Sequence, residues 1–159
     1  PYYDALPDIV NEYMEKINAL TGRNYKPFNY YGADDAEHVI VVMGSAAGCI
    51  QETIDYLTAR GEKVGLLEIH LYRPFSTKYF LGALPETVTR ITVLDRTKEP
   101  GAAGEPLYED VCSVILESGR GIQVYAGRFG LATKAFTPAQ VIAVYANMKT
   151  DPPTNHLTF

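Results

Sequence analysis

The feature that most constrains the fold of this chain is a repeated alternation of short apolar runs with segments of helical periodicity. The run Val39–Met43 is apolar throughout, which is typical of a strand buried on both faces of a parallel sheet. Similar runs at residues 64–69, 90–95 and 122–126 are predicted to be strands as well. Because helical segments separate these strands, the connections are expected to be right-handed crossovers. The chain is therefore predicted to be an α/β protein with a largely parallel sheet covered on both faces.

Helix start and stop signals support this alternation. Ser76 is placed to cap a short helix that ends near residue 84, and Thr137 precedes a proline, which is a favoured first helical residue. Gly61 marks the end of a helix that starts after Gly48. Helices are therefore expected at about residues 48–60, 76–84, 107–118 and 137–149.

The two ends of the 159-residue chain fall outside the alternation. Residues 1–35 are interpreted as an arm, with a helix that begins after Pro7 and ends near Gly22, followed by an aromatic segment too irregular for a helix. Residues 36–150 are expected to form the α/β domain, and residues 151–159 a linker to a following domain. Since the first residue is not Met, the chain is expected to be a piece of a longer one.

Composition argues against several classes of protein. The formal net charge of -5 argues against nucleic acid as a partner, because phosphate binding requires a basic face. No apolar run reaches the length of a membrane span and no signal peptide is visible, so no membrane partner is expected. Cys49 and Cys112 are interpreted as small buried residues in a reducing compartment, which predicts a cytoplasmic location. Two cysteines cannot supply the four thiolates of an iron–sulfur cluster.

The turn at residues 44–48 is the best local candidate for a binding site. Gly44, Ser45 and Gly48 lie where the first predicted strand passes into a helix, and such a turn points backbone N–H groups at an anion. Glu68 imitates the acidic residue of a dinucleotide fold, but the spacing G-x-x-x-G does not match the glycine fingerprint of that fold. The alternative is a tight turn whose glycines permit close packing, and the sequence leaves both interpretations open.

Basic side chains form a second candidate. Arg73, Arg96 and Arg128 fall in loops or at ends of the predicted strands, as do Lys98 and Lys134. Because ligands of open parallel sheets bind beyond the carboxyl ends of the strands, these cations predict an anion site or a charged docking edge. The alternative is ion pairing with acids of the same loops, namely Glu68, Asp95, Glu99 and Glu105.

No catalytic or metal-binding residue is assigned. His38, His70 and His156 each lack a second His or Cys at ligand spacing, so no metal site is supported. His70 ends a predicted strand, but no nucleophile lies nearby in the sequence. It is more simply a packed, hydrogen-bonded histidine than a general base.

Several of these loops, taken in order along the chain, resemble one family. The segments that carry the resemblance include Tyr72–Ser76 (YRPFS), Asp95–Tyr108 (DRTKEPGAAGEPLY) and Gly127–Leu131 (GRFGL). They resemble the second domain of pyruvate:ferredoxin (or flavodoxin) oxidoreductase, a domain similar to the C-terminal domain of transketolase. The resemblance implies a three-layer α/β/α sandwich with a mostly parallel, mixed five-stranded sheet and one antiparallel edge strand. One strand is then missing from the four above, near residues 134–136 or around Tyr30.

The resemblance also implies a role within a larger enzyme. In that family pyruvate and coenzyme A become acetyl-CoA and CO2, with thiamine diphosphate, Mg²⁺ and [4Fe-4S] clusters, and electrons pass to ferredoxin or flavodoxin. This chain has neither the G-D-G…N diphosphate motif nor a cysteine cluster, so no cofactor and no catalytic residue is expected here. The expected role is a non-catalytic structural domain, docked on other domains or on the second subunit of a homodimeric parent. The alternative is an anion-binding module that holds a coenzyme A phosphate with the residue 44–48 turn and the strand-end arginines.

Overall fold

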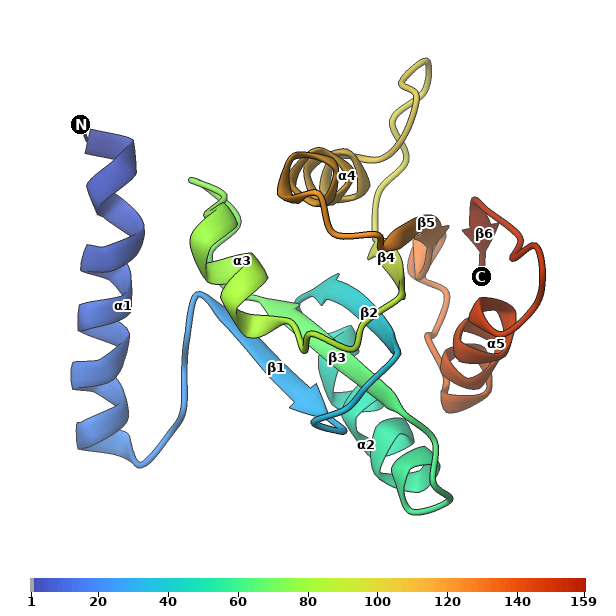
Figure 1. Cartoon of the computed structure of the whole chain (residues 1–159), viewed down its shortest axis with the longest axis horizontal. Helices are drawn as coiled ribbons and strands as arrows, with labels where there is room; N and C mark the ends of the chain where they lie inside the picture. Colours follow the sequence, from blue (N-terminus) through green and yellow to red (C-terminus); the bar gives the residue numbers. More distant parts are fainter. Residues whose placement is uncertain (1) are drawn as a thin grey trace.

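The computed structural model describes residues 2–159 and arranges them in three layers, with helices on both sides of one sheet (Figure 1). The strands are β1 (Phe28–Gly32), β2 (His38–Met43), β3 (Val64–Ile69), β4 (Arg90–Asp95), β5 (Gln123–Arg128) and β6 (Leu157–Thr158). The helices are α1 (Tyr2–Thr21), α2 (Ala46–Thr58), α3 (Thr77–Ala83), α4 (Pro106–Ser118) and α5 (Pro138–Met148), with a 3₁₀ turn at Leu131–Thr133. The sheet order is β1-β3-β2-β4-β5-β6.

The two faces of the sheet carry separate halves of the core. Val39 and Val41 of β2 face the layer formed by α3 and α4, whereas Ile40 and Val42 face the layer formed by α2 and α5. All four side chains are fully buried, as the uniformly apolar run predicted. The three-layer α/β/α sandwich expected from the resemblance is therefore confirmed.

The sheet has more strands than expected. β2 to β5 lie at the four predicted runs and pair in parallel. The strand missing from that set is β1 in the Tyr30 region, which pairs antiparallel with β3 at the edge of the sheet. Residues 134–136 are not a strand. A sixth, two-residue strand pairs with β5, so the count is six rather than five. Both segments expected to lie outside the α/β domain thus contribute a strand to its sheet.

The last strand and the residue Asn155 cover the outer edge of the second half of β5. Leu157 and Thr158 pair in parallel with Gly127 and Arg128. One step earlier along β5, the N–H of Ala126 donates a hydrogen bond to Oδ1 of Asn155 at 2.7 Å. The segment expected to be a free linker therefore supplies backbone and side-chain partners to an edge strand.

Several helix ends agree with their sequence signals, but two helix starts do not. Helix α2 begins at Ala46 and includes Gly48, which was expected to precede it. Ser76 accepts a hydrogen bond from the N–H of Tyr79 at the start of α3, and Thr137 and Gln140 form a capping box at the start of α5. Helix α1 begins at Tyr2 and contains Pro7 in its second turn, instead of beginning after that residue. The expected start is therefore wrong by nearly two turns. Pro7 lacks an N–H, so the helix forgoes one backbone hydrogen bond there and continues.

Candidate functional site

The loops at the carboxyl ends of β2 to β5 place the predicted basic residues in three separate environments. Arg128 faces the start of α4, Arg73 faces the side of α4, and Arg96 lies beside the β2–α2 turn. The six candidate residues therefore do not form one site. Ser45 and Arg96 come together, whereas Arg73 and Arg128 are each paired with a carboxylate elsewhere.

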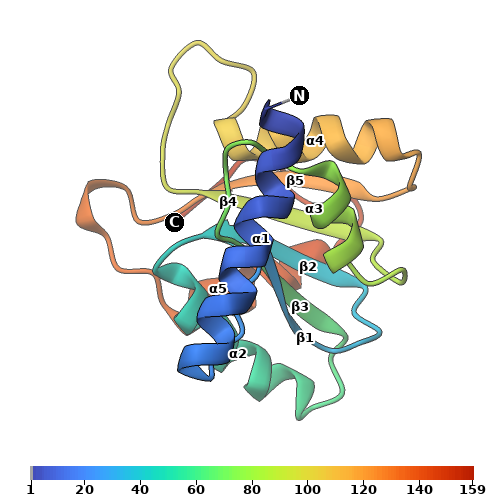
Figure 2. The ribbon, with the colours of Figure 1, turned by 90° about the vertical axis from the view of Figure 1, so that its left-hand side faces the viewer.

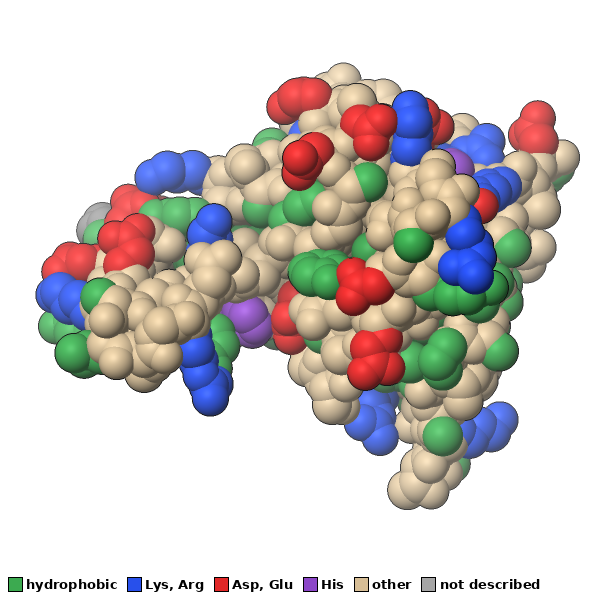
Figure 3. Space-filling model, turned by 90° about the horizontal axis from the view of Figure 1, so that it is seen from below, with side chains coloured by type: hydrophobic (Ala, Val, Ile, Leu, Met, Phe, Trp, Pro, Cys, Tyr) green, Lys and Arg blue, Asp and Glu red, His purple; other side chains and the backbone are tan. Residues whose placement is uncertain are grey.

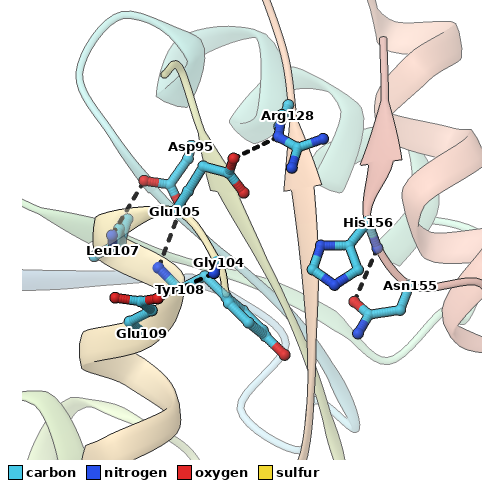
Figure 4. A network of polar contacts seen from close by, with 9 residues as sticks. All are labelled: Asp95, Gly104, Glu105, Leu107, Tyr108, Glu109, Arg128, Asn155 and His156. Atoms are coloured by element: carbon cyan, nitrogen blue, oxygen red, sulfur yellow. Dashed lines mark hydrogen bonds and ion pairs between the residues drawn. The ribbon is translucent and has the colours of Figure 1, made fainter. Parts of the chain in front are cut away.

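Arg128 forms a buried ion pair with Glu105 (Figure 4). Its Nε donates to Oε1 of Glu105 at 2.6 Å, and Glu105 is only 2% exposed. Burial raises the pKa of Glu105, but the hydrogen bond and the charge of Arg128 outweigh it and hold this pKa below its ordinary value. Of the two interpretations offered for the basic residues, ion pairing is therefore correct for Arg128. Its partner Glu105 is one of the four acids that the sequence suggested.

Asp95 anchors the start of α4 from the end of β4. Its Oδ1 accepts from the N–H of Leu107 and its Oδ2 from the N–H of Tyr108, both at 3.1 Å (Figure 4). Burial raises the pKa of Asp95, and the two backbone donors oppose that rise. Since the first N–H groups of a helix have no helical acceptor, this carboxylate acts as a cap supplied by a strand end.

These contacts fix both ends of the β4–α4 loop (residues 96–104). Glu105 and Asp95 hold its two ends, and Oε1 of Glu109 accepts from the N–H of Gly104 at 3.0 Å. Residues 98–103 between these anchors are all exposed, and Figure 1 shows the loop projecting at the top of the molecule. The loop is therefore rigid at its base and solvent-facing at its tip.

Arg73 is also neutralised, but on the surface. Its Nη1 lies 2.8 Å from Oδ2 of Asp110 on α4, and its guanidinium stacks 3.8 Å from the ring centroid of Tyr72. The Arg73 side chain is 56% exposed, so this pair is solvent-screened. Asp110 was not among the predicted partners, because nothing in the sequence shows which side of α4 meets the loop after β3.

A basic cavity of about 280 Å³ lies at the start of α2. Its polar lining comes from Ser45, Arg96, Thr133 and Lys134, with the rings of Phe129 and Phe136 beside them, and no carboxylate lines it. Arg96 donates through Nε to the carbonyl oxygen of Gly130 at 3.4 Å. Among residues 2–159, neither Arg96 nor Lys134 has a carboxylate at ion-pair distance.

The two glycines of the predicted 44–48 turn lie in different elements, because Gly44 is in the turn and Gly48 is in the first turn of α2. Gly44 has φ of +75°, a left-handed conformation that favours glycine, and this lets β2 turn sharply into α2. Gly48 has open space where a Cβ would stand, and it does not line the basic cavity. Close packing therefore explains neither glycine, and Ser45 makes no side-chain cap hydrogen bond to α2.

The cysteines and histidines are accounted for by local contacts. Cys49 and Cys112 are half-buried rather than buried as expected, and burial raises the pKa of both thiols. The Nδ1 of His70 lies 3.0 Å from the carbonyl oxygen of Lys26, which agrees with a hydrogen-bonded histidine. Within the described residues no group of three His, Cys, Asp or Glu side chains could hold a metal ion. Nor is any helix in this part of the chain both long and apolar enough to span a bilayer.

The cysteines described here do not fit an iron–sulfur cluster, which is one of the cofactors of the resembled family. Two half-buried cysteines do not provide an iron–sulfur ligand set, and the paired arginines are taken up by carboxylates of the same chain. The fold and its strand-end edge thus define a three-layer α/β/α domain with a rigid projecting loop and one small basic cavity.

Comparison with known proteins assigns the domain to a family. The family model described as "Pyruvate:ferredoxin oxidoreductase core domain II" matches residues 36–141, which is more than half of the chain. The chain therefore belongs to the core domain II family of pyruvate:ferredoxin oxidoreductase.

Two similar relatives show how small a part of a protein this chain represents. It is 54% identical over 158 residues to the pyruvate:ferredoxin oxidoreductase of Moorella thermoacetica, covering 99% of this chain and 14% of that protein. It is 50% identical to a putative pyruvate-flavodoxin oxidoreductase of Synechocystis, covering 99% of this chain and 13% of the relative. The chain corresponds to a single domain of these oxidoreductases.

One solved structure agrees with the fold. A 2-oxoglutarate:ferredoxin oxidoreductase from Magnetococcus marinus, with 2-oxoglutarate, coenzyme A and succinyl-CoA bound, matches with a TM-score of 0.52 at 21% identity. The match covers 83% of this chain and 21% of that chain. At this identity it supports the fold alone.

Proposed function

We propose that this chain is the non-catalytic interface domain of a longer oxidoreductase that makes acetyl-CoA and CO2 from pyruvate and coenzyme A. Thiamine diphosphate with Mg²⁺ and the [4Fe-4S] clusters would be held by other parts of that enzyme, which would be a cytoplasmic homodimer. Ferredoxin or flavodoxin would dock on those other parts. The domain's own work is to position neighbouring domains or the second subunit.

The observation that carries this proposal is that the β4–α4 loop has an exposed tip and ends fixed by buried carboxylates. An exposed loop containing glycine, proline and alanine is costly to order, yet two carboxylates that are 2–3% exposed fix its ends. Fixed ends restrict the positions that the tip can take, which reduces the entropy lost when another surface binds it. Glycine in the tip also permits close approach of a second backbone.

Limited proteolysis of the loop tests the interface role. In the isolated chain a protease should cut between residues 98 and 103, where every residue is exposed. In the whole polypeptide the same bonds should resist, because a neighbouring domain covers them. Equal cutting rates in both would contradict the proposal.

A second assay tests the absence of catalysis. The isolated chain should not reduce viologen with pyruvate and coenzyme A, because its sequence has neither the G-D-G…N diphosphate motif nor a cysteine cluster. Pyruvate-dependent reduction by the purified chain would refute the non-catalytic role.

A second candidate function is anion binding, for example of a coenzyme A phosphate. The basic cavity favours it, because Arg96 and Lys134 bring two cations without a neighbouring carboxylate to the start of α2. The guanidinium fork of arginine suits phosphate oxygens. Arg73 and Arg128 take no part in this refined version of the site.

Calorimetric titration of the isolated chain with coenzyme A at low salt tests this candidate. Binding in the micromolar to low millimolar range that weakens at least tenfold in Arg96→Ala supports it. Arg73→Ala is the matched control, since the cation removed there is already paired with Asp110. If no heat is measured, or if both variants lose the same affinity for coenzyme A, anion binding is refuted and the interface role is the remaining candidate.

A further inference from the structure

Helix α1 carries an apolar stripe that nothing in the described structure covers. Tyr2, Ile9, Tyr13, Ile17 and Leu20 recur at intervals of three, four or seven residues, so they lie on one face of the helix. They are between 46% and 86% exposed. Figure 3, viewed along this helix at the left of the molecule, shows hydrophobic side chains on the side turned away from the body. We call these five residues the outer stripe.

The inner side of α1 is attached by polar contacts and by a few half-buried apolar side chains (Leu6, Val10 and Met14) rather than by a fully buried core. Of residues 2–21 only Pro7 is buried. Oδ1 of Asp8 lies 3.0 Å from Nζ of Lys78 and accepts from the hydroxyl of Tyr79 at 2.8 Å. A hollow of about 480 Å³ separates part of α1 from α3 and β1. Figure 2, seen from the α1 side, shows the helix lying across the body of the domain.

The far end of α1 is positioned by Asn18. Its side-chain amide donates to the carbonyl oxygen of Tyr25 at 2.8 Å, and its Oδ1 accepts from the N–H of the same residue at 2.7 Å. The helix is therefore oriented near both ends although Pro7 is its single fully buried residue among residues 2–21. Because most helical stability in proteins comes from packing of an apolar face, a helix that packs so little on its own domain gains little stability from it.

The size of the outer stripe points to one kind of occupant. A single aromatic side chain presents roughly 150–250 Å² when fully exposed, so five half-exposed large side chains offer on the order of 500 Å². A stable contact between separate chains buries roughly 800 Å² on each partner, which the stripe alone does not reach. Contacts between domains of one chain bury as little as about 600 Å² in total. Covalent connection raises the effective concentration of such a partner and makes a small contact sufficient.

We propose that the outer stripe docks on an apolar surface of another domain of the same, longer polypeptide, and that α1 is ordered by that contact. The relatives contain much additional chain that could supply such a domain, since this sequence makes up only 13–14% of their length. The inference rests on the proposed interface function and names a second docking element, on a different part of the domain from the β4–α4 loop.

Hydrogen exchange of α1 in the two contexts tests the proposal. Amides of residues 9–20 should exchange at least tenfold more slowly in the whole polypeptide than in the isolated chain, which has a complete core of its own. Leu20→Asp in the whole polypeptide should abolish this protection. Ala19→Asp is the matched control, because it adds the same charge at the adjacent exposed position, off the stripe.

Three outcomes would overturn the inference. The first is equal exchange of α1 in both contexts, and the second is an equal effect of the two substitutions. The third is a concentration-dependent dimer of the isolated chain that Leu20→Asp dissociates, which would assign the stripe to a second copy. If the loop resists proteolysis in the whole polypeptide while α1 stays unprotected, the interface function stands and only this inference fails.

Discussion

The β4–α4 loop and helix α1 are attached to the same domain by opposite means. The loop has no regular structure at its tip, but its ends are held by Asp95 and Glu105, which are 2–3% exposed. Helix α1 has regular structure along its whole length, but solvent reaches the contacts of Asp8 that hold it. Buried polar contacts are strong when complete and costly when broken, whereas exposed ones contribute little. Regular secondary structure is thus a poor guide to which segment is fixed.

The largest expected effect comes from Arg128→Ala. Removal of the guanidinium leaves the carboxylate of Glu105 buried without its partner, which should cost about 3–5 kcal/mol of unfolding free energy. Urea unfolding of the isolated chain measures this. Arg73→Ala breaks the surface pair with Asp110 and should cost less than about 1 kcal/mol. Similar losses in the two variants would mean that burial does not distinguish the pairs.

The next effect is expected for Asp95→Ala. It removes the acceptor of two backbone N–H groups at the start of α4 and should cost about 2 kcal/mol. Proteolysis of the β4–α4 loop should accelerate in the same variant, because the base of the loop loses an anchor. Asp95→Asn retains one acceptor oxygen, so its unfolding free energy should lie between those of Asp95→Ala and the unsubstituted chain. A stable variant with an unchanged cutting rate would show that the loop is not held from β4.

A smaller effect is expected for Asn18→Ala. Two hydrogen bonds to Tyr25 are lost, worth about 1 kcal/mol of local stability together. The loss should be visible in the exchange of α1 amides but not in the global unfolding midpoint, because α1 contributes little to the core. A shift of the global midpoint would show that α1 is part of the cooperative unit.

The smallest effect concerns Asp8 and acid pH. The hydrogen bonds from Lys78 and Tyr79 lower the pKa of Asp8 below its ordinary value of 3.8. A lowered pKa means that the contact favours folding above the ordinary value and is lost as the pH falls through the folded value. NMR shifts of the amides next to Asp8 should therefore change below about pH 4, and Asp8→Asn should reduce this change. An identical acid step in Asp8→Asn would assign the titration to another group.

The sequence predicts the central part of this fold well, because a strand that is buried on both faces consists of apolar residues throughout. Helices cover both faces of β2, and its residues Val39–Met43 form an uninterrupted apolar run. β1 lies at an edge, includes Asn29 and ends in Gly32, so its residues have no such pattern, and only the family resemblance indicated an additional strand. β6 has two residues, which is too short for any periodicity.

The candidate site was predictable in composition but not in arrangement. That basic residues follow the strands is visible in the sequence, and the parallel sheet gathers them at one edge. Which of them pairs depends on helix α4, since Glu105 and Asp110 lie at its start and on its side. The sequence shows Ile9, Tyr13, Ile17 and Leu20 at helical spacing, but their exposure depends on how α1 packs against the rest of the domain.

The contact between Asn155 and the edge of β5 has a consequence for the domain in concentrated solution. An open strand edge recruits edges of other molecules and leads to aggregation, unless something occupies its free N–H and carbonyl groups. Here the amide side chain of Asn155 and the short β6 occupy them over Ala126 to Arg128. A chain shortened to residue 153 would keep every central strand and both halves of the core. It should nevertheless precipitate at lower concentrations than the 159-residue chain, because the edge of β5 over Ala126 to Arg128 would then be open to other molecules.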